Sequence, residues 1–359
     1  MKGTFVKLAI VIVFFFSCRK AEQKNNPSVD KDLFVSAVDI SSFPEIVKSD
    51  PTFFDLKGNP KDFLVILKEC GVNTIRLRLW VNPPGENSSF EQVKEFAKAL
   101  QLMGFKICLS VHYSDTWADP GNQRTPEHWQ GLSFSSLKDS VYHYTKSIMT
   151  QIKPDYIQIG NEINTGFLHP FGHINNNYSG FIELLKSATL AVREDSSDCK
   201  IIIHFAGLRG LDWFFNQVKT IDYDIIGLSY YPIWHGKSLA ELKLNMQQLG
   251  DLYKKKILIA ETAYPFTLAW NDWTNNIVGL SDQLILPEYP ALPEGQRNFI
   301  HHIKKIVEES PTGLGFCYWG GELIAWKGKQ ATNGSPWENQ ALFDFNNLAL
   351  PVLEVFKEE

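Results

Sequence analysis

Short apolar runs alternate with longer segments of helical period along most of the chain, and this pattern predicts eight strands. The runs are rich in β-branched residues and are bounded by polar or turn-forming stretches, as is typical of strands buried on both faces. The predicted strands are residues 34–40, 74–80, 106–112, 156–160, 200–205, 224–230, 257–261 and 315–319.

Amphipathic segments lie between these runs and predict the helices. The predicted helices are residues 62–70, 90–103, 137–152, 178–194, 211–219, 239–253 and 296–309, with a last short helix at 350–356. Asn59-Pro60, Ser88-Ser89 and Ser135-Ser136 have the residue types that begin helices.

Strand–helix alternation over eight units indicates a parallel sheet. The first strand ends at Asp39 rather than in a glycine-rich phosphate-binding turn, which disfavours an open dinucleotide-binding sheet. We therefore predict an α/β fold with a single (β/α)8 TIM barrel over residues 32–359.

The first residues are predicted to lie outside the barrel. Residues 1–17 combine early lysines with an apolar run, which indicates a signal peptide. Ser17-Cys18 resembles a bacterial lipobox, so we expect cleavage before Cys18, a lipid on that cysteine and a polar tether over residues 18–31. This predicts an exported, lipid-anchored protein of the bacterial outer membrane, with the face that carries the anchor left open. The alternative is a plain signal peptide with an incidental cysteine.

Composition narrows the possible partners. The net charge is −5 and there is no long basic run, so we expect no nucleic acid partner, and we expect a monomer. None of the remaining cysteines belongs to a Cys-x-x-Cys pair, and Cys108 and Cys317 lie in apolar runs, which predicts buried thiols without a disulfide or zinc site. The 10 Trp are explained equally well by sugar-binding platforms and by a large core.

A TIM barrel carries its chemistry at the C-terminal ends of its strands. Those ends are polar or aromatic along almost the whole chain, whereas the strand beginnings are unremarkable lysines. The strand-end candidates are Asp39, Arg76, Arg78, Trp80, His112, Asp115, Asn161, Glu162, His204, Tyr230, Tyr231, Glu261 and Trp319.

Glu162 and Glu261 end the fourth and seventh predicted strands, and paired carboxyl groups across a cleft can hydrolyse a glycosidic bond. Glu162 is the candidate acid/base, with a helix cap as the alternative. Glu261 is the candidate nucleophile, with a structural ion pair as the alternative. Arg76 shares a strand face with Arg78 and requires carboxylate partners, which would keep Glu261 ionised.

The other candidates are assigned to substrate contacts. Tyr230 is expected to hydrogen-bond the nucleophile, while Tyr231 and Trp234 line the cleft. His112 is interpreted as a contact to a sugar hydroxyl rather than as a metal ligand. Trp319 is expected to form the floor under the cleaved sugar, and Trp80 is left open between cleft and core.

Longer motifs join these residues. They are Val38-Asp39-Ile-Ser-Ser, Arg76-Leu-Arg78-Leu-Trp80, His112-Tyr-Ser-Asp115-Thr-Trp117-Ala-Asp119-Pro, Gly160-Asn161-Glu162, Ser229-Tyr230-Tyr231-Pro-Ile-Trp234-His235-Gly, Ala260-Glu261-Thr262 and Tyr318-Trp319. With them the chain closely resembles the endo-β-1,4-galactanases of glycoside hydrolase family 53, from about residue 32 to residue 319.

The resemblance implies a retaining double displacement on β-1,4-galactan, the side chain of type I arabinogalactan, with Glu162 as acid/base and Glu261 as nucleophile. It implies no required cofactor. The implied substrate-binding residues are Asp39, Arg76, Arg78, His112, Asp115, Trp117, Asn161, His204, Tyr230, Tyr231, Trp234, His235 and Trp319.

The loop after the seventh strand departs from many bacterial members, which carry a calcium site there. Here only Asp272 and a few asparagines are available, so calcium is not expected and no metal ligand is assigned. Trp270 and Trp273 form either an outer sugar subsite or loop packing. Two other functions remain open: a barrel glycosidase acting on another β-1,4-glycan, mannan or glucan, and a non-catalytic glycan-binding lipoprotein.

Overall fold

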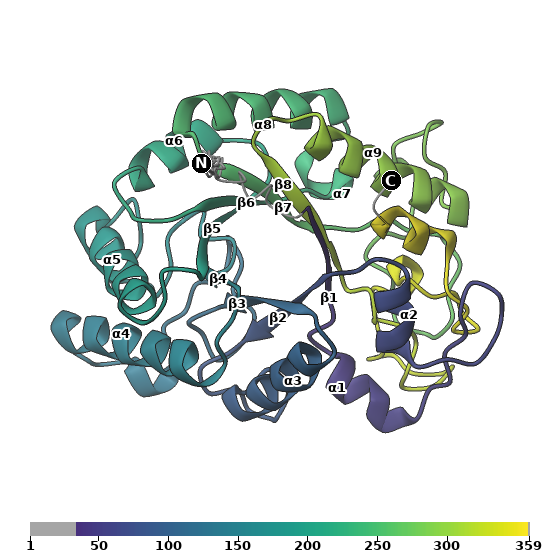
Figure 1. Cartoon of the computed structure of the whole chain (residues 1–359), viewed down its shortest axis with the longest axis horizontal. Helices are drawn as coiled ribbons and strands as arrows, with labels where there is room; N and C mark the ends of the chain where they lie inside the picture. Colours follow the sequence, from purple (N-terminus) through teal and green to yellow (C-terminus); the bar gives the residue numbers. More distant parts are fainter. Residues whose placement is uncertain (1–33, 358–359) are drawn as a thin grey trace, which may run out of the picture. The chain divides into compact units, whose positions relative to one another are not determined.

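The computed structural model describes residues 34–357, in which eight parallel strands close into a barrel in sequence order (Figure 1). The strands are β1 Val35–Asp39, β2 Thr74–Leu79, β3 Lys106–Val111, β4 Tyr156–Ile159, β5 Lys200–Ala206, β6 Ile225–Ser229, β7 Lys256–Thr262 and β8 Gly313–Trp319. Pairing of β1 with β8 closes the sheet, which confirms the predicted (β/α)8 fold. The predicted signal peptide, Cys18 and tether lie outside the described residues.

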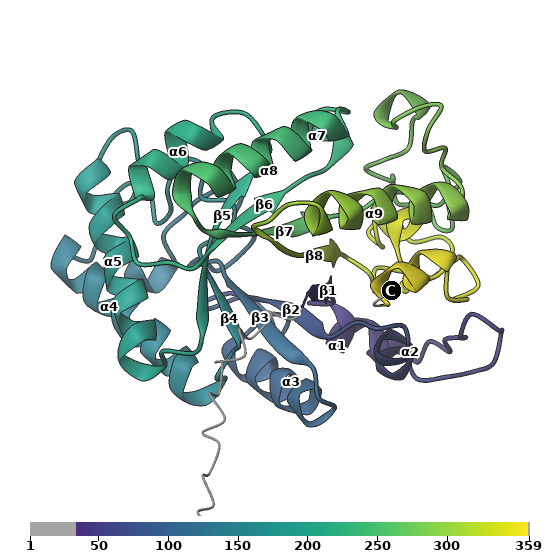
Figure 2. The ribbon, with the colours of Figure 1, turned by 45° about the horizontal axis from the view of Figure 1, so that its top comes forward.

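Helices surround the strands (Figures 1 and 2). They are α1 Phe43–Ile46, α2 Phe63–Glu69, α3 Phe90–Leu102, α4 Phe134–Gln151, α5 Tyr178–Asp195, α6 Leu211–Val218, α7 Pro232–His235, α8 Leu239–Tyr253 and α9 Pro293–Glu308. Short 3-10 turns are η1 Val47–Ser49, η2 Glu127–Trp129, η3 Ser281–Gln283, η4 Glu338–Gln340 and η5 Pro351–Phe356. None of the described helices is both long and apolar enough to cross a membrane.

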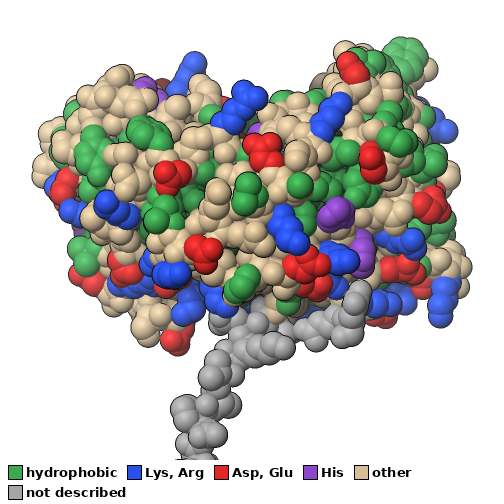
Figure 3. Space-filling model, turned by 90° about the horizontal axis from the view of Figure 1, so that it is seen from above, with side chains coloured by type: hydrophobic (Ala, Val, Ile, Leu, Met, Phe, Trp, Pro, Cys, Tyr) green, Lys and Arg blue, Asp and Glu red, His purple; other side chains and the backbone are tan. Residues whose placement is uncertain are grey.

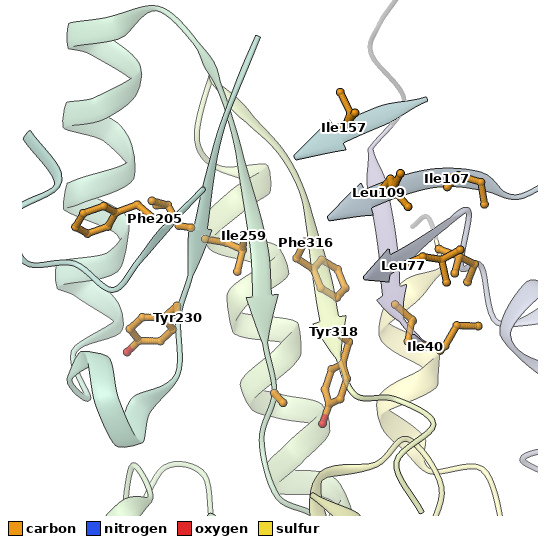
Figure 4. Packing of buried hydrophobic residues seen from close by; sticks show 14 of the residues in the cluster. Ile40, Leu77, Ile107, Leu109, Ile157, Phe205, Tyr230, Ile259, Phe316 and Tyr318 are labelled. Carbon is orange, nitrogen blue, oxygen red and sulfur yellow. The ribbon is translucent and has the colours of Figure 1, made fainter. Parts of the chain in front are cut away.

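Strand alternation produces two hydrophobic layers. Residues such as Ile75, Leu77 and Ile259 belong to a large buried cluster between the strands and the helices, part of which is drawn in Figure 4. A second, smaller cluster that includes Cys108, Ile202 and residues of β1, β7 and β8 fills the barrel interior. Cys108 and Cys317 are buried free thiols, as predicted.

The predicted strands and long helices are confirmed to within a few residues, but two of the predicted N-caps are wrong. Asp62, not Asn59, caps α2 by accepting a hydrogen bond from the N–H of Val65. Ser133, not Ser135, caps α4 in the same way. In both cases the short polar side chain directly before the first helical residue accepts from an otherwise unpaired backbone N–H of the first turn.

Two long loops extend the C-terminal face of the barrel, over residues 263–292 after β7 and 320–349 after β8. Glu338 joins them, since its Oε1 accepts from the N–H groups of Asn271 and Asp272 at 2.6 and 3.3 Å. The side-chain amide of Asn339 donates to the carbonyls of Thr267 and Val278.

On the molecular face drawn in Figure 3, acidic and basic side chains are interspersed.

Candidate active site

A cleft of about 740 Å³ opens among the strand ends and the loops after β7 and β8. The predicted site residues that line this cleft are Asp39, Arg78, Trp117, Asn161, Glu162, Tyr231, Trp234, His235, Glu261 and Trp319. The barrel therefore gathers residues that are up to 280 positions apart in sequence, from Asp39 to Trp319, at one end of the parallel sheet.

Arg76 is the electrostatic centre beneath this cleft. Its side chain is almost completely buried, with Nη1 2.6 Å from Asp39 and Nη2 2.7 Å from Glu261. Burial alone disfavours the guanidinium charge, but the two carboxylates outweigh burial and raise the pKa of Arg76. Nη2 also contacts the side-chain oxygens of Asn161, Gln158 and Ser110. This network fixes Glu261 and Asn161 relative to each other.

A β-bulge aims Glu261 into the cleft. Simple alternation would place Glu261 on the same face as Ile257 and Ile259, which point toward the helices. The pairing of β6 with β7 passes from Leu228–Ile259 to Ser229–Glu261, so Ala260 has no opposite residue. The extra residue turns the carboxyl inward, where it meets Arg76 and the hydroxyl of Tyr231, 3.1 Å from Oε2.

Glu162 is held in an uncommon backbone conformation. It follows Gly160 and Asn161 after β4 and has a φ of 47°, in the left-handed region. The side-chain amide of Gln123 donates to the carbonyls of Asn161 and Glu162, and the N–H of Ile163 donates to the carbonyl of His204. Such strain persists only where surrounding contacts hold it, and it is concentrated at functional sites.

The two carboxyl groups differ in their partners. Burial, then the charge of Glu261, raises the pKa of Glu162 to about 8, against a single donor, the hydroxyl of Ser229. Burial also raises the pKa of Glu261, but Arg76 and Tyr231 oppose that rise. A proton shared by this pair therefore resides on Glu162 while Glu261 is ionised.

One carboxyl oxygen of Glu162, one of Glu261 and a ring nitrogen of His204 lie within 4.8 Å of one another. Among residues 34–357 this is the one group of three or more His, Cys, Asp or Glu side chains with such spacing. It is unsuited to a metal, since His204 Nδ1 already accepts from the N–H of Glu162 and Nε2 contacts Ser229.

Several predicted substrate contacts are wrong in detail. Tyr230 is fully buried in the layer between strands and helices (Figure 4). Its hydroxyl donates to the carbonyl of Gly236. Tyr231, which shares a strand face with Ser229, takes the contact to Glu261 that was expected of Tyr230. His204 is also fully buried, so it acts beneath the cleft rather than on a sugar.

His112 and Asp115 do not line the cleft, and both stabilise neighbouring loops through hydrogen bonds to backbone N–H groups. Nδ1 of His112 accepts from the N–H of Ala118, and the ring lies against Trp80 and Trp117. The carboxylate of Asp115 accepts from two backbone N–H groups, those of residues 82 and 127. Both residues thereby position the loop that carries Trp117.

An aromatic wall surrounds the carboxyl pair. The Arg78 guanidinium lies between the rings of Trp80 and Trp117, 4.5 and 4.0 Å from their centroids. Trp80 is thus part of the wall's support. Trp319 contacts Trp117 and Trp337, and Trp337 in turn stacks on Trp234.

Sequence reasoning missed Trp326 and Trp337, which line the cleft from the long loop after β8, away from any strand end. It also missed Glu322 in the same loop and Ser229 at the end of β6. Alternation gave a signal for Ser229, because Gly227 and Ser229 share the inner face, whereas no pattern marked residues in the loop.

The loop after β7 offers Asp272 and a few asparagines as calcium ligands, and Glu338 of the loop after β8 lies against it. Asp272 and Glu338 each have a buried carboxylate oxygen without a hydrogen-bond partner. Asn276 of the same loop adds a buried amide oxygen without a partner. Calcium takes six to eight oxygens, so these side chains alone do not make up a calcium site, and no metal ligand is assigned. Trp270 and Trp273 are 50% and 61% exposed, so neither belongs to the core. The outer subsite and packing of the loop against the barrel both stay predictions.

Paired carboxyl groups in an aromatic cleft at the C-terminal end of a (β/α)8 barrel define a glycoside hydrolase. Comparison with known proteins agrees with this class. The family model described as "Glycosyl hydrolase family 53" matches residues 35–356, and the chain belongs to this family.

The sequence similarity to galactanases extends over almost the whole chain. The chain is 32% identical to the arabinogalactan endo-β-1,4-galactanase of Cellvibrio japonicus, over 93% of both chains. It is 30% identical to the endo-β-1,4-galactanase of Bacillus subtilis, over 93% of this chain and 87% of that one. The solved GH53 catalytic domain of Ignisphaera aggregans superposes with a TM-score of 0.85 at 38% identity, covering 92% of this chain and 97% of the other.

Proposed function

We propose that the protein is an endo-acting β-1,4-galactanase that retains anomeric configuration. The observation that supports retention is the approach of the Glu162 and Glu261 carboxyl oxygens to within 4.8 Å. Retaining glycosidases separate their carboxyl groups by about 5–5.5 Å, whereas inverting enzymes need about 6.5–9.5 Å to admit a water molecule. The galactan substrate is supported by the names of the family relatives.

In the first step an ionised oxygen of Glu261 attacks the anomeric carbon while Glu162 gives its proton to the departing glycosidic oxygen. The bond between carbon and leaving oxygen breaks, and a galactosyl ester forms on Glu261. Arg76 and Tyr231 keep Glu261 ionised before attack. In the second step Glu162, now a carboxylate, takes a proton from water, whose oxygen displaces Glu261.

Digestion of linear β-1,4-galactan with product analysis tests substrate and endo action together. We expect a series of short oligosaccharides early in the digest, and the first-formed products should have the β configuration by NMR. Cleavage of mannan or glucan but not galactan would overturn the substrate. Early α products would overturn retention.

Substitution of the carboxyl pair tests the assignment of roles. Glu162→Ala and Glu261→Ala should each reduce kcat on galactan by about 10²-fold or more, because each removes a group acting directly in bond cleavage. Variants as active as the parent would disprove the assignment. A folded parent that binds galactan without cleaving it would support the binding-protein alternative.

We also propose, from residues 1–31 of the sequence alone, that the protein is exported and lipid-anchored through Cys18. Metabolic labelling with palmitate should mark the parent expressed in a bacterial host and should not mark Cys18→Ser. Equal labelling of both would overturn the anchor. A sedimentation measurement on residues 32–359 tests the proposed monomer.

A further inference from the structure

Three hydrogen bonds form a closed ring that begins and ends at Glu162. The backbone N–H of Glu162 donates to Nδ1 of His204 at 3.2 Å. Nε2 of His204 lies 2.9 Å from the hydroxyl oxygen of Ser229, and that hydroxyl donates to Oε1 of Glu162 at 2.6 Å. The ring joins the ends of β4, β5 and β6.

The chemistry of the groups sets the direction of each bond. A backbone N–H can only donate, so Nδ1 of His204 must accept. Burial, together with the charge of Arg76 and with His235, lowers the pKa of His204 well below its usual value, so its imidazole is neutral. Its one proton therefore lies on Nε2 and points to Ser229, whose own proton must point to Oε1 of Glu162.

This direction determines which oxygen of Glu162 carries the acid proton. Oε1 already accepts a hydrogen bond from Ser229, which leaves Oε2 as the oxygen that holds the proton. Glu162 is partly exposed and lines the cleft, whereas His204 and Ser229 are fully buried beneath it. The proton is thus presented by the side of the carboxyl group that the ring does not occupy.

We propose that His204 and Ser229 are positioning residues that keep the transferable proton of Glu162 on Oε2. The proposal rests on the proposed glycosidase function and adds two residues to it. Neither touches the sugar. In the first step the ring directs the proton toward the glycosidic oxygen, and in the second it keeps the same oxygen free to take a proton from water. His204 itself neither gains nor loses a proton.

A merely structural role for the ring predicts a different outcome from a role in proton delivery. A leaving group that departs as a stable anion needs no proton, so a defect in proton delivery disappears with such a substrate. Loss of fold or of sugar binding affects all substrates alike. The leaving group therefore separates the two roles.

The test compares Ser229→Ala with the parent on galactan and on 2,4-dinitrophenyl β-1,4-galactobioside. On galactan kcat/KM should fall about tenfold or more, since general acid catalysis contributes about 10²–10⁴-fold in total. On the dinitrophenyl substrate it should change by less than about twofold. The alkaline limit of kcat/KM on galactan should move upward, because the Ser229 hydroxyl holds the pKa of Glu162 down.

Controls make each outcome decisive. Ser36→Ala removes an equally buried serine at the opposite end of the barrel and should match the parent on both substrates. If Ser229→Ala does not fold, His204→Asn is used instead. Its amide oxygen can replace Nδ1 as the acceptor for the Glu162 N–H, but the shorter side chain has no atom at the position of Nε2 and so no donor to Ser229. It should show the same dependence on the leaving group. An equal loss of kcat/KM on both substrates would overturn the proposed role of the ring in proton delivery. So would no loss in Ser229→Ala while Glu162→Ala is inactive. A parent inactive on galactan overturns the proposed function instead.

Discussion

At the residue scale, the two carboxyl groups are distinguished by how many donors each receives. Glu261 accepts hydrogen bonds from Arg76 and Tyr231, whereas the carboxyl group of Glu162 accepts one from Ser229 alone. A carboxylate is stabilised by each hydrogen bond it accepts, so the richer set favours the ionised nucleophile. The sequence indicated Arg76 as that partner, but Tyr231 and Ser229 emerge only when strand alternation is combined with the register of β6.

The first prediction concerns the pH dependence of activity. Glu162 must hold its proton, and its pKa is about 8, so kcat/KM on galactan should fall above about pH 8. Glu261 must be ionised, and burial raises its pKa, so activity should fall on the acid side at a pH above its usual value of 4.5. A pH–rate profile checks both limits. An alkaline limit that survives in Glu162→Gln would contradict the assignment.

Glu322 yields a prediction about stability. Burial and the nearby charge of Asp39 raise the pKa of its carboxyl to about 8, although its Oε1 accepts from the N–H of Ser42. Between pH 4.5 and 8 the unfolded chain has lost a proton that the folded protein keeps. The free energy of unfolding therefore decreases as pH rises, by up to about 1.4 kcal/mol per pH unit for this group.

Glu322→Gln should remove that dependence, because glutamine keeps an acceptor for Ser42 and carries no charge. Urea denaturation at pH 5 and pH 8 measures it: relative to the parent, the variant should gain stability at pH 8. The exposed Glu354→Gln serves as the control. An identical pH slope in parent and Glu322→Gln would show that Glu322 does not titrate in this range.

At the element scale, periodicity located the strands and long helices because each buries a regular apolar face. It did not predict the β-bulge in β7, since an unpaired Ala260 leaves no mark in a run of apolar residues. Nor did it predict the exact helix starts. The serines at residues 133, 135 and 136 all suit an N-cap, and backbone geometry selects among them.

The cap of α4 provides a matched pair of variants. Ser133→Ala should lower the free energy of unfolding by about 1 kcal/mol, because the N–H of Ser136 loses its acceptor. Ser135→Ala, inside the first turn, should be neutral or slightly stabilising owing to the helix propensity of alanine. Denaturation midpoints of the two variants measure the difference. A larger loss in Ser135→Ala would restore Ser135 as the cap.

At the scale of the whole molecule, the C-terminal turn η5 is part of the core. Phe356 is fully buried and contacts Phe316 of β8, and the carbonyl of Lys357 accepts from the nearly buried ammonium of Lys304. The sequence predicted a short helix at residues 350–356 but not its burial, because seven residues cannot establish a period. The contacts arise between segments distant in sequence.

Phe356→Ala should therefore destabilise the barrel by about 3–5 kcal/mol, the usual cost of removing a buried aromatic side chain. Glu354→Ala, on the exposed side of the same turn, should change stability by less than about 0.5 kcal/mol. Thermal unfolding of the two variants checks the contrast. Equal melting temperatures would mean that η5 packs only loosely.

The aromatic wall gives the molecule an optical reporter of its own. Half of the chain's 10 tryptophans, namely Trp117, Trp234, Trp319, Trp326 and Trp337, line the cleft. A bound oligosaccharide must displace water from these indoles, and indole emission responds to the polarity around the ring. Intrinsic fluorescence of an inactive Glu261→Ala variant should therefore shift on titration with galacto-oligosaccharides, so occupancy can be followed without any label and before any bond is broken.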